Sequence, residues 1–114
     1  MSVNVAISIG DINGIGPEVV LKSLSQIDLT DCAPMVLSNR KVVDFYTDLL
    51  NIRLPYQVID SPDDIKSGRM NVTDCYRNEP VIVEPGTLSG SNGKLAMMAV
   101  EQGIDLCTSG LCDA

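Results

Sequence analysis

Apolar residues recur along the chain with two different spacings, and these predict strands and helices in alternation. Every second residue from Val3 to Ile9 is apolar, which predicts a strand, and apolar residues three or four positions apart follow Pro17, which predicts a helix. The same change of spacing recurs further along, so we expect an α/β domain. The expected strands are residues 3–9, 35–37, 56–59, 71–75 and 81–83. Helices are expected to begin at Pro17, after Ser38 or Asn39, at Ser61 and after Gly93.

The pattern also predicts which residues face the core. Residues 3–9 are mostly apolar, as in a central strand, whereas residues 71–75 are expected at an edge of the sheet. Gly110 is expected to end the last helix in a left-handed conformation. No repeat or linker interrupts residues 1–114, so we expect no domain boundary, and the sequence stops where another strand would begin. The core-facing side of the three longer helices is expected to consist of Val20, Leu24 and Ile27, of Val42, Phe45 and Leu49, and of Met97, Val100, Ile104, Cys107 and Leu111.

The charge balance and the absence of histidine exclude several classes of function. Of the 114 residues, 8 are lysine or arginine and 15 are aspartate or glutamate, so the formal net charge is −7. Such a chain lacks the cationic surface that binding to nucleic acid requires, and we expect no nucleic-acid partner. Because the chain contains no histidine, a histidine metal site, a Ser/His or Cys/His pair and a histidine proton shuttle are excluded within it.

The first residues and the cysteines indicate a cytoplasmic protein. Residues 1–4 lack the basic and apolar regions of a secretory signal, and no apolar run reaches the length that spans a membrane. The four cysteines are too sparse for a small disulfide-bonded scaffold, and the spacing of Cys107 and Cys112 differs from that of a Cys-x-x-Cys pair. We therefore expect buried or half-buried free thiols, a cytoplasmic location and no membrane partner.

One segment, residues 10–18, has a sequence that indicates a binding function. It reads Gly-Asp-Ile-Asn-Gly-Ile-Gly-Pro-Glu and lies between the first strand and the first helix. Gly14 and Gly16 allow a ligand to approach the backbone closely, and the start of the helix directs free N–H groups toward the turn. Asp11 could accept hydrogen bonds from a ligand, or it could brace the turn by accepting one from the N–H two residues later. The spacing matches neither the G-x-G-x-x-G dinucleotide motif nor a P-loop, so a purely structural turn is the alternative.

Residues 7–18, together with Leu21 and Lys22, resemble the start of the 4-hydroxythreonine-4-phosphate dehydrogenases of pyridoxal phosphate (vitamin B6) biosynthesis, which typically reads G-D-P-A-G-I-G-P-E. Later blocks agree in order, including Pro85-Gly86, Ser89, Asn92-Gly93 and the Cys-Asp-Ala of residues 112–114. The resemblance covers nearly the whole chain but only the N-terminal part of the longer family members. It implies a layered α/β/α fold with a mixed or mostly parallel sheet, like that of isocitrate and isopropylmalate dehydrogenases, incomplete in this chain. Ile12 and Asn13 replace the usual Pro-Ala, which is expected to loosen the turn and to add an amide donor.

The resemblance also implies a reaction. Family members oxidise 4-phosphooxy-L-threonine with NAD, with decarboxylation, using a divalent metal (Zn, Mg or Co) in a homodimer. By analogy with the related dehydrogenases, Gly10, Asp11, Asn13, Gly14 and Gly16 are expected to form a cofactor-binding loop beside the nicotinamide end of the cleft. The histidines that hold the metal lie in the later portion of the family, so no catalytic residue and no metal ligand is carried over to this chain. The chain alone is therefore expected to be inactive.

Two other interpretations stay open. The chain could belong to another metal-dependent decarboxylating dehydrogenase that acts on a different phosphorylated or hydroxylated acid, or it could be a non-catalytic α/β binding or assembly module. In either case, a sheet without its next strand leaves an unpaired edge and apolar helix faces. We therefore expect the isolated chain to associate or to be only marginally stable.

Overall fold

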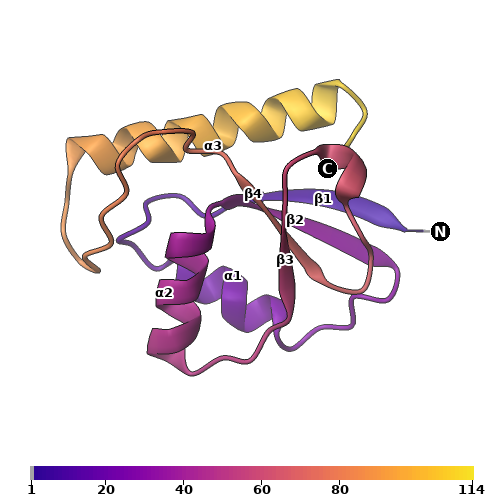
Figure 1. Cartoon of the computed structure of the whole chain (residues 1–114), viewed down its shortest axis with the longest axis horizontal. Helices are drawn as coiled ribbons and strands as arrows, with labels where there is room; N and C mark the ends of the chain where they lie inside the picture. The colour runs from indigo at the N-terminus through magenta and orange to yellow at the C-terminus, as the bar shows by residue number, and fades with distance from the viewer. Residues whose placement is uncertain (1) are drawn as a thin grey trace.

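Four parallel strands form one sheet in the computed structural model, which describes residues 2–114. The elements are β1 (Val3–Ser8), α1 (Gly16–Leu24), β2 (Cys32–Ser38), α2 (Arg40–Leu50), β3 (Tyr56–Ile59), the 3-10 helix η1 (Pro62–Asp64), β4 (Met70–Asp74) and α3 (Gly90–Thr108). The strands lie in the order β1-β2-β4-β3, and every neighbouring pair is parallel. The chain therefore moves across the sheet from β1 to β3 and then turns back to insert β4 (Figure 1).

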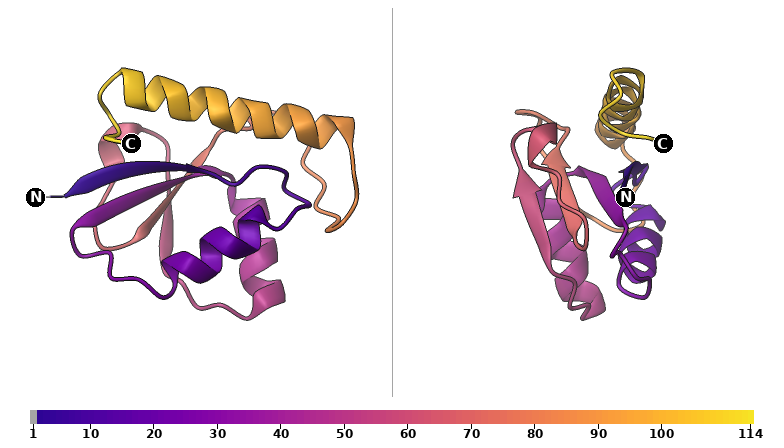
Figure 2. Two further views of the ribbon diagram at one scale, coloured as in Figure 1. Left: turned by 180° about the vertical axis from the view of Figure 1, so that it is seen from behind. Right: turned by 90° about the vertical axis from the view of Figure 1, so that its right-hand side faces the viewer.

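Helices cover both faces of this sheet. α1 and α2 contact each other on one face, and α3 crosses the opposite face over β1 and β2 (Figures 1 and 2). Right-handed crossovers explain this placement, because connections that move in opposite directions across a parallel sheet cover opposite faces. The expected layered α/β/α fold is confirmed, with a sheet that is parallel throughout residues 2–114. No helix in this part of the chain is long and apolar enough to cross a membrane.

Local sequence signals set the ends of the helices. Pro17 lies in the first turn of α1, and Glu18 adds a negative charge near the positive end of the helix. Asn39 caps α2, since its side-chain oxygen accepts a hydrogen bond from the N–H of Val42 at 3.0 Å. After α3, Gly110 has a φ of +82°, as expected for the residue that ends a helix.

The core is centred on β2, which lies between β1 and β4. Residues 33–38 of β2 are all buried, as in a parallel strand that is covered on both faces. Met70 and Val72 of β4 are buried beside it. Tyr76, two residues after the end of β4, is also buried and donates a hydrogen bond to Ser38 Oγ at 3.3 Å. A continuous apolar run of the sequence, residues 32–37, therefore occupies the middle of the sheet.

Three expectations about the sheet are wrong. Residues 71–75, expected at an edge, overlap β4, which lies between β2 and β3. Residues 3–9, expected in the centre, contain β1, which forms an edge of the sheet in residues 2–114 and has partly exposed side chains. Residues 81–83 form no strand. A short apolar run has the same sequence pattern whether it pairs in a sheet or only packs on the core. Here Val81 packs on the core, and its carbonyl accepts a hydrogen bond from Lys41 Nζ rather than from a neighbouring strand.

The apolar faces of α1 and α2 also differ from the expected ones. α1 ends at Leu24, so Ile27 lies beyond the helix and is exposed. Phe45 and Leu49 of α2 are exposed as well, because the helix is turned so that the neighbouring stripe meets the sheet. The residues that α2 buries are Val42, Val43 and Tyr46.

The stripe of α3 that was expected to face the core is largely exposed instead, and Val100, Ile104 and Cys107 border an open hollow beside β1. Met97, Val100 and Ile104 are 58%, 42% and 56% exposed, Cys107 is exposed, and Leu111 lies beyond the helix. This helix carries apolar residues on two sides, and periodicity alone cannot tell which side meets the sheet. The apolar residues that α3 buries are Leu95, Ala99 and Leu106.

All four cysteines are free thiols, as expected, but their surroundings differ. Cys75 and Cys112 are buried and Cys32 is half-buried, whereas Cys107 is exposed, against the expectation. Burial, with a smaller contribution from the charge of Asp74, raises the pKa of Cys75 to about 12. The chemical reactivity of the thiols should therefore differ strongly along the chain.

Candidate ligand-binding site

The turn between β1 and α1 is held by its own backbone and by Asp11. Gly10 begins the turn with a φ of +72°, a conformation that favours glycine. Asp11 Oδ1 accepts a hydrogen bond from the N–H of Asn13 at 2.9 Å, and the Asp11 carbonyl accepts one from the N–H of Gly14 at 3.0 Å. Asp11 therefore braces the turn in the way that its structural role predicts.

The two later glycines of the turn have different neighbours. A Cβ atom at Gly16 would lie 2.0 Å from the carbonyl oxygen of Ile9, so only glycine lets α1 begin this close to the end of β1. A Cβ atom at Gly14 would lie 3.4 Å from the Asp11 carbonyl oxygen, which is a tolerable contact, and Gly14 is exposed. Gly10 is exposed too, with open space around it. Packing therefore requires Gly16, whereas Gly10 and Gly14 leave the outer side of the turn accessible.

Asn13 joins this turn to the loop that precedes α3. Its side chain is 6% exposed, and its Oδ1 accepts a hydrogen bond from the N–H of Glu84 at 2.7 Å, while its Nδ2 donates one to the carbonyl of Thr87 at 3.0 Å. The Asn13 carbonyl also accepts a hydrogen bond from the N–H of Gly86 at 2.8 Å. The expectation that Asn13 adds an amide donor is confirmed, since Nδ2 donates to Thr87. The expectation that it loosens the turn is wrong, because these hydrogen bonds tie the turn to the loop.

Tyr46 of α2 supports the turn from the core side. Its hydroxyl donates a hydrogen bond to the carbonyl of Ile12, a fully buried residue. Burial, and to a smaller extent the negative charge of Asp11, raises the pKa of Tyr46. The phenol therefore stays protonated at neutral pH and continues to act as a donor to the turn.

A cavity of about 170 Å³ lies between this turn and the N-terminus of α3. Ser89 caps the helix, since its Oγ accepts a hydrogen bond from the N–H of Asn92 at 3.4 Å. The wall of the cavity combines an apolar side, a carboxylate and several hydroxyl and amide groups. We call it the turn–helix cavity, and its lining includes Asn13, Ile82, Glu84, Thr87, Ser91 and Asn92.

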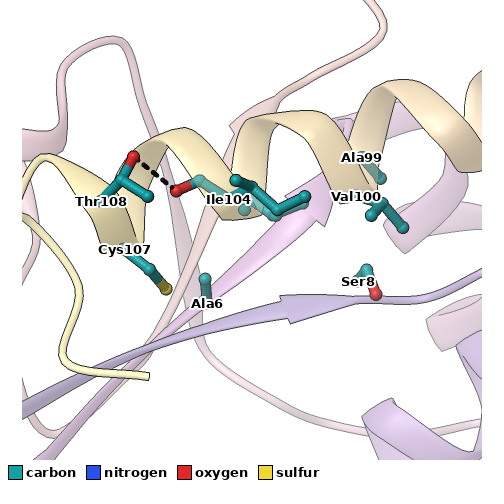
Figure 3. Close-up of a pocket in the computed structure, with 9 residues that line it drawn as sticks. Ala6, Ser8, Ala99, Val100, Ile104, Cys107 and Thr108 are labelled. Carbon is teal, nitrogen blue, oxygen red and sulfur yellow. Dashed lines mark hydrogen bonds between the residues drawn. The ribbon is translucent and has the colours of Figure 1, made fainter.

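A second hollow, of about 330 Å³, lies between α3 and β1 (Figure 3). Val100, Ile104 and Cys107 line it from the helix, and Ala6 and Ser8 line it from the strand. These side chains are small or apolar and include no charged group. The hollow, which we call the α3–β1 groove, therefore suits the packing of apolar side chains better than the binding of a charged small molecule.

The last residues of the chain lie along the outer edge of β1. The N–H of Asp113 donates a hydrogen bond to the carbonyl of Asn4, and the N–H of Ala6 donates one to the carbonyl of Ala114, both at 2.8 Å. Asp113 Oδ2 also accepts a hydrogen bond from the N–H of Asn4 at 2.9 Å. Residues 113–114 therefore satisfy part of the edge of β1 that would otherwise be unpaired.

The structure places the predicted site residues together and reveals others that the sequence analysis did not single out. Gly10, Asp11, Asn13, Gly14 and Gly16 lie in one turn or at its end, although a role in cofactor binding stays a prediction. No three His, Cys, Asp or Glu side chains gather as possible metal ligands within residues 2–114. The sequence analysis gave no role to Glu84, Ser91 or Asn92. Only Asn92 carried a signal, through its place in the family-like block of residues 85–93 and the Ser89-x-x-Asn92 spacing of a helix cap, and neither signal predicts a cavity.

Comparison with known proteins gives this arrangement a family context. The chain is 33% identical over 113 residues to a 4-hydroxythreonine-4-phosphate dehydrogenase of Prosthecochloris aestuarii, in a match that covers 94% of this chain and 33% of that protein. The chain is homologous to about one third of a 4-hydroxythreonine-4-phosphate dehydrogenase. A relative of the same name from Bacteroides thetaiotaomicron is 30% identical, over 97% of this chain and 30% of its own length. The expected resemblance is thus confirmed, and the chain spans about a third of the curated relatives it matches.

Solved structures agree with the sequence relatives. A 4-hydroxythreonine-4-phosphate dehydrogenase from Klebsiella pneumoniae superposes with a TM-score of 0.82 at 26% identity, covering 98% of this chain and 35% of that one. The enzyme of that name from Burkholderia phymatum has the same fold, with a TM-score of 0.85 at 23% identity, over 98% of this chain and 34% of its own. No protein-family model matches the chain. A further relative, from Clostridium botulinum and 27% identical over 96% of this chain and 34% of its own length, is provisionally named a D-threonate 4-phosphate dehydrogenase.

Proposed function

We propose that this chain forms one third of a NAD-dependent, divalent-metal-dependent dehydrogenase that oxidises and decarboxylates 4-phosphooxy-L-threonine. The observation that carries the proposal is the match of nearly the whole chain, at 33% identity, to part of a protein named for this activity. A dehydrogenase is an oxidoreductase, and both of the first two relatives carry that name. NAD, the metal and the homodimer follow from the resemblance to the family, the cytoplasmic location follows from the first residues and the cysteines, and all four belong to the proposal.

The turn after β1 suits contact with the cofactor. The first turn of α1 has no side-chain cap, so its N–H groups are free to meet a polar group of a ligand. Gly10 and Gly14 are exposed beside them. We therefore assign direct contact to Gly10, Asp11 and Gly14. Asn13 and Gly16 act by fixing the backbone on which those contacts depend.

The metal belongs elsewhere in this proposal. A divalent cation would polarise the hydroxyl that is oxidised, but residues 2–114 contain no cluster of ligands that fits one. We therefore assign the metal ligands to the remaining two thirds of the longer protein. The chain alone should reduce no NAD when supplied with substrate and metal.

A chimera tests the proposed function. This chain would replace the matching third of the Prosthecochloris aestuarii relative, and NADH formation from 4-phosphooxy-L-threonine and NAD would be followed with Mg²⁺ or Zn²⁺ present. We expect turnover by the chimera and none by this chain alone. A chimera that folds and dimerises like the parent relative yet forms no NADH would contradict the proposal and would favour the non-catalytic binding module. The intact relative serves as the positive control.

A second candidate reaction is the oxidation of D-threonate 4-phosphate. The relative from Clostridium botulinum, 27% identical, is the observation in its favour. Both substrates are four-carbon acids that carry a terminal phosphate, but one bears an ammonium group beside the carboxylate where the other bears a hydroxyl. The same chimera, supplied with each substrate in turn, separates the two reactions.

A further inference from the structure

The exposed apolar residues of α3 follow a seven-residue pattern. Met97, Val100 and Ile104 are spaced three and four positions apart, and Cys107 and Leu111 continue the same spacing. This spacing is the one that places apolar side chains along a single line of contact between two packed helices. Met97, Val100 and Ile104, which we call the α3 seam, are exposed in the structure of residues 2–114. The helix therefore presents a surface of the kind that packs against another helix.

The α3 seam lies next to further apolar surface. Val100 and Ile104 also border the α3–β1 groove, whose lining contains no charged side chain (Figure 3). Apolar side chains of a second helix could pack against the seam and the edge of this groove together. Removal of such surface from water is the main favourable contribution to the association of proteins.

The charges on α3 indicate which helix would pack there. Lys94, Glu101 and Asp105 are its only charged residues. Lys94 and Glu101 are seven positions apart, so both flank the α3 seam on the same side. The side chain of Lys94 is 62% exposed although it forms an ion pair with Glu79, and Glu101 is exposed and forms no ion pair within residues 2–114. A complementary partner would bring an acidic group to Lys94 and a basic group to Glu101.

A second copy of α3 meets this requirement when the two helices are antiparallel. In such a pair, residues at equal distances from the midpoint face each other. A midpoint between Met97 and Met98 lies about 5 Å along the axis from both Lys94 and Glu101, so Lys94 of one protomer faces Glu101 of its partner, twice by symmetry. The antiparallel orientation also brings opposite ends of the helix dipoles together. In a parallel pair the two charged residues would lie on opposite flanks and would not meet.

We propose that two copies of this chain form a symmetric dimer through antiparallel packing of α3. The α3 seam is buried in the interface, and Lys94 pairs with Glu101 of the other copy. The proposal concerns the 114-residue chain itself and is independent of the proposed reaction and of the homodimer assigned to the longer protein. It specifies a register, whereas exposed apolar surface alone predicts association without one. The interface is small, so the dimer is expected to be reversible.

Sedimentation of the 114-residue chain over a range of concentrations tests the dimer with charge reversals at exposed positions. Glu101→Lys and Lys94→Glu should each raise the dissociation constant at least about fivefold, because two attractions between protomers become two repulsions. The double variant restores opposite charges and should recover the affinity of the native chain to within about twofold. Asp105→Lys is the matched control: it makes the same change of charge on α3, outside the seam and its flanks, and should not weaken the dimer.

These variants also separate the proposed dimer from general association. Glu101→Lys makes the chain less negative, so it would associate more tightly if repulsion between like-charged copies were decisive. Glu101→Gln removes the attraction without adding a repulsion and should weaken the dimer by a smaller factor than Glu101→Lys. Tighter association of Glu101→Lys, a double variant as weak as the single ones, or a native chain whose sedimentation does not depend on concentration would overturn the proposal.

Discussion

Replacing Asn13 by alanine should uncouple the turn after β1 from the loop that precedes α3. The variant loses two side-chain hydrogen bonds, one from the N–H of Glu84 at 2.7 Å and one to the carbonyl of Thr87 at 3.0 Å. A typical hydrogen bond contributes about 0.5–1.5 kcal/mol to the net stability of a protein. Glu84 and Thr87 are exposed residues, so water can reach the freed backbone groups and no further penalty for buried unpaired groups is expected. The free energy of unfolding should therefore fall by about 2 kcal/mol.

Urea unfolding and hydrogen exchange measure this effect. The midpoint of unfolding should fall at unchanged m-value, and exchange should accelerate first at the amides of Glu84 and Gly86, which bond to Asn13 in the native chain. Asn78→Ala is the matched control, because Asn78 is exposed and should change stability by less than about 0.5 kcal/mol. If both variants lose equally little stability and the Glu84 amide stays protected, the coupling role of Asn13 is refuted.

Four further predictions concern packing, thiols, pH and association. Gly93 lies within α3, and a Cβ atom added there would meet no neighbouring atom within 4 Å. Gly93→Ala should therefore stabilise the chain by about 0.5–1 kcal/mol in thermal unfolding, because alanine loses less backbone entropy than glycine when the helix forms. A thiol reagent such as DTNB should modify exposed Cys107 first and leave Cys75 unmodified until unfolding. Burial raises the pKa of Cys75 to about 12, so the folded state holds the thiol proton more tightly than the unfolded state does. The contribution of this thiol to the free energy of unfolding is therefore present below about pH 9 and is lost between about pH 9 and 12. Urea unfolding midpoints measured across that pH range should fall accordingly. Exposed apolar residues of α3 such as Ile104 should make the chain associate. Ile104→Lys should therefore lower the sedimentation coefficient toward that of a monomer. An unsubstituted chain that sediments as a monomer at every concentration would contradict this prediction.

Local signals made much of the fold predictable. Pro17, Asn39 and Gly110 act on the backbone within a few residues of their own position, so the sequence pattern was enough to place the helix ends that they set. The order of the strands was not predictable in this way. β4 lies between β2 and β3 because the chain turns back after β3, and nothing in residues 71–75 records that return.

In the candidate site, too, the features set by local residues were predictable and those set by long-range contacts were not. The turn of residues 10–16 was found because glycine, aspartate and proline have local conformational roles. The cavity was missed because it depends on contacts between residues about 70 positions apart, such as those of Asn13 with Glu84 and Thr87. The exposed side of α3 was missed for a related reason, since Met97 and Leu95 are both apolar and only the tertiary structure decides which one is covered.

The substrate preference of the chimera tests the central claim most directly, namely that this chain forms one third of a dehydrogenase that oxidises 4-phosphooxy-L-threonine. The measurement is the ratio of kcat/KM for 4-phosphooxy-L-threonine to that for D-threonate 4-phosphate, followed through NADH formation. We predict a ratio well above one. A ratio below one, or a folded chimera that oxidises neither substrate, would contradict the claim.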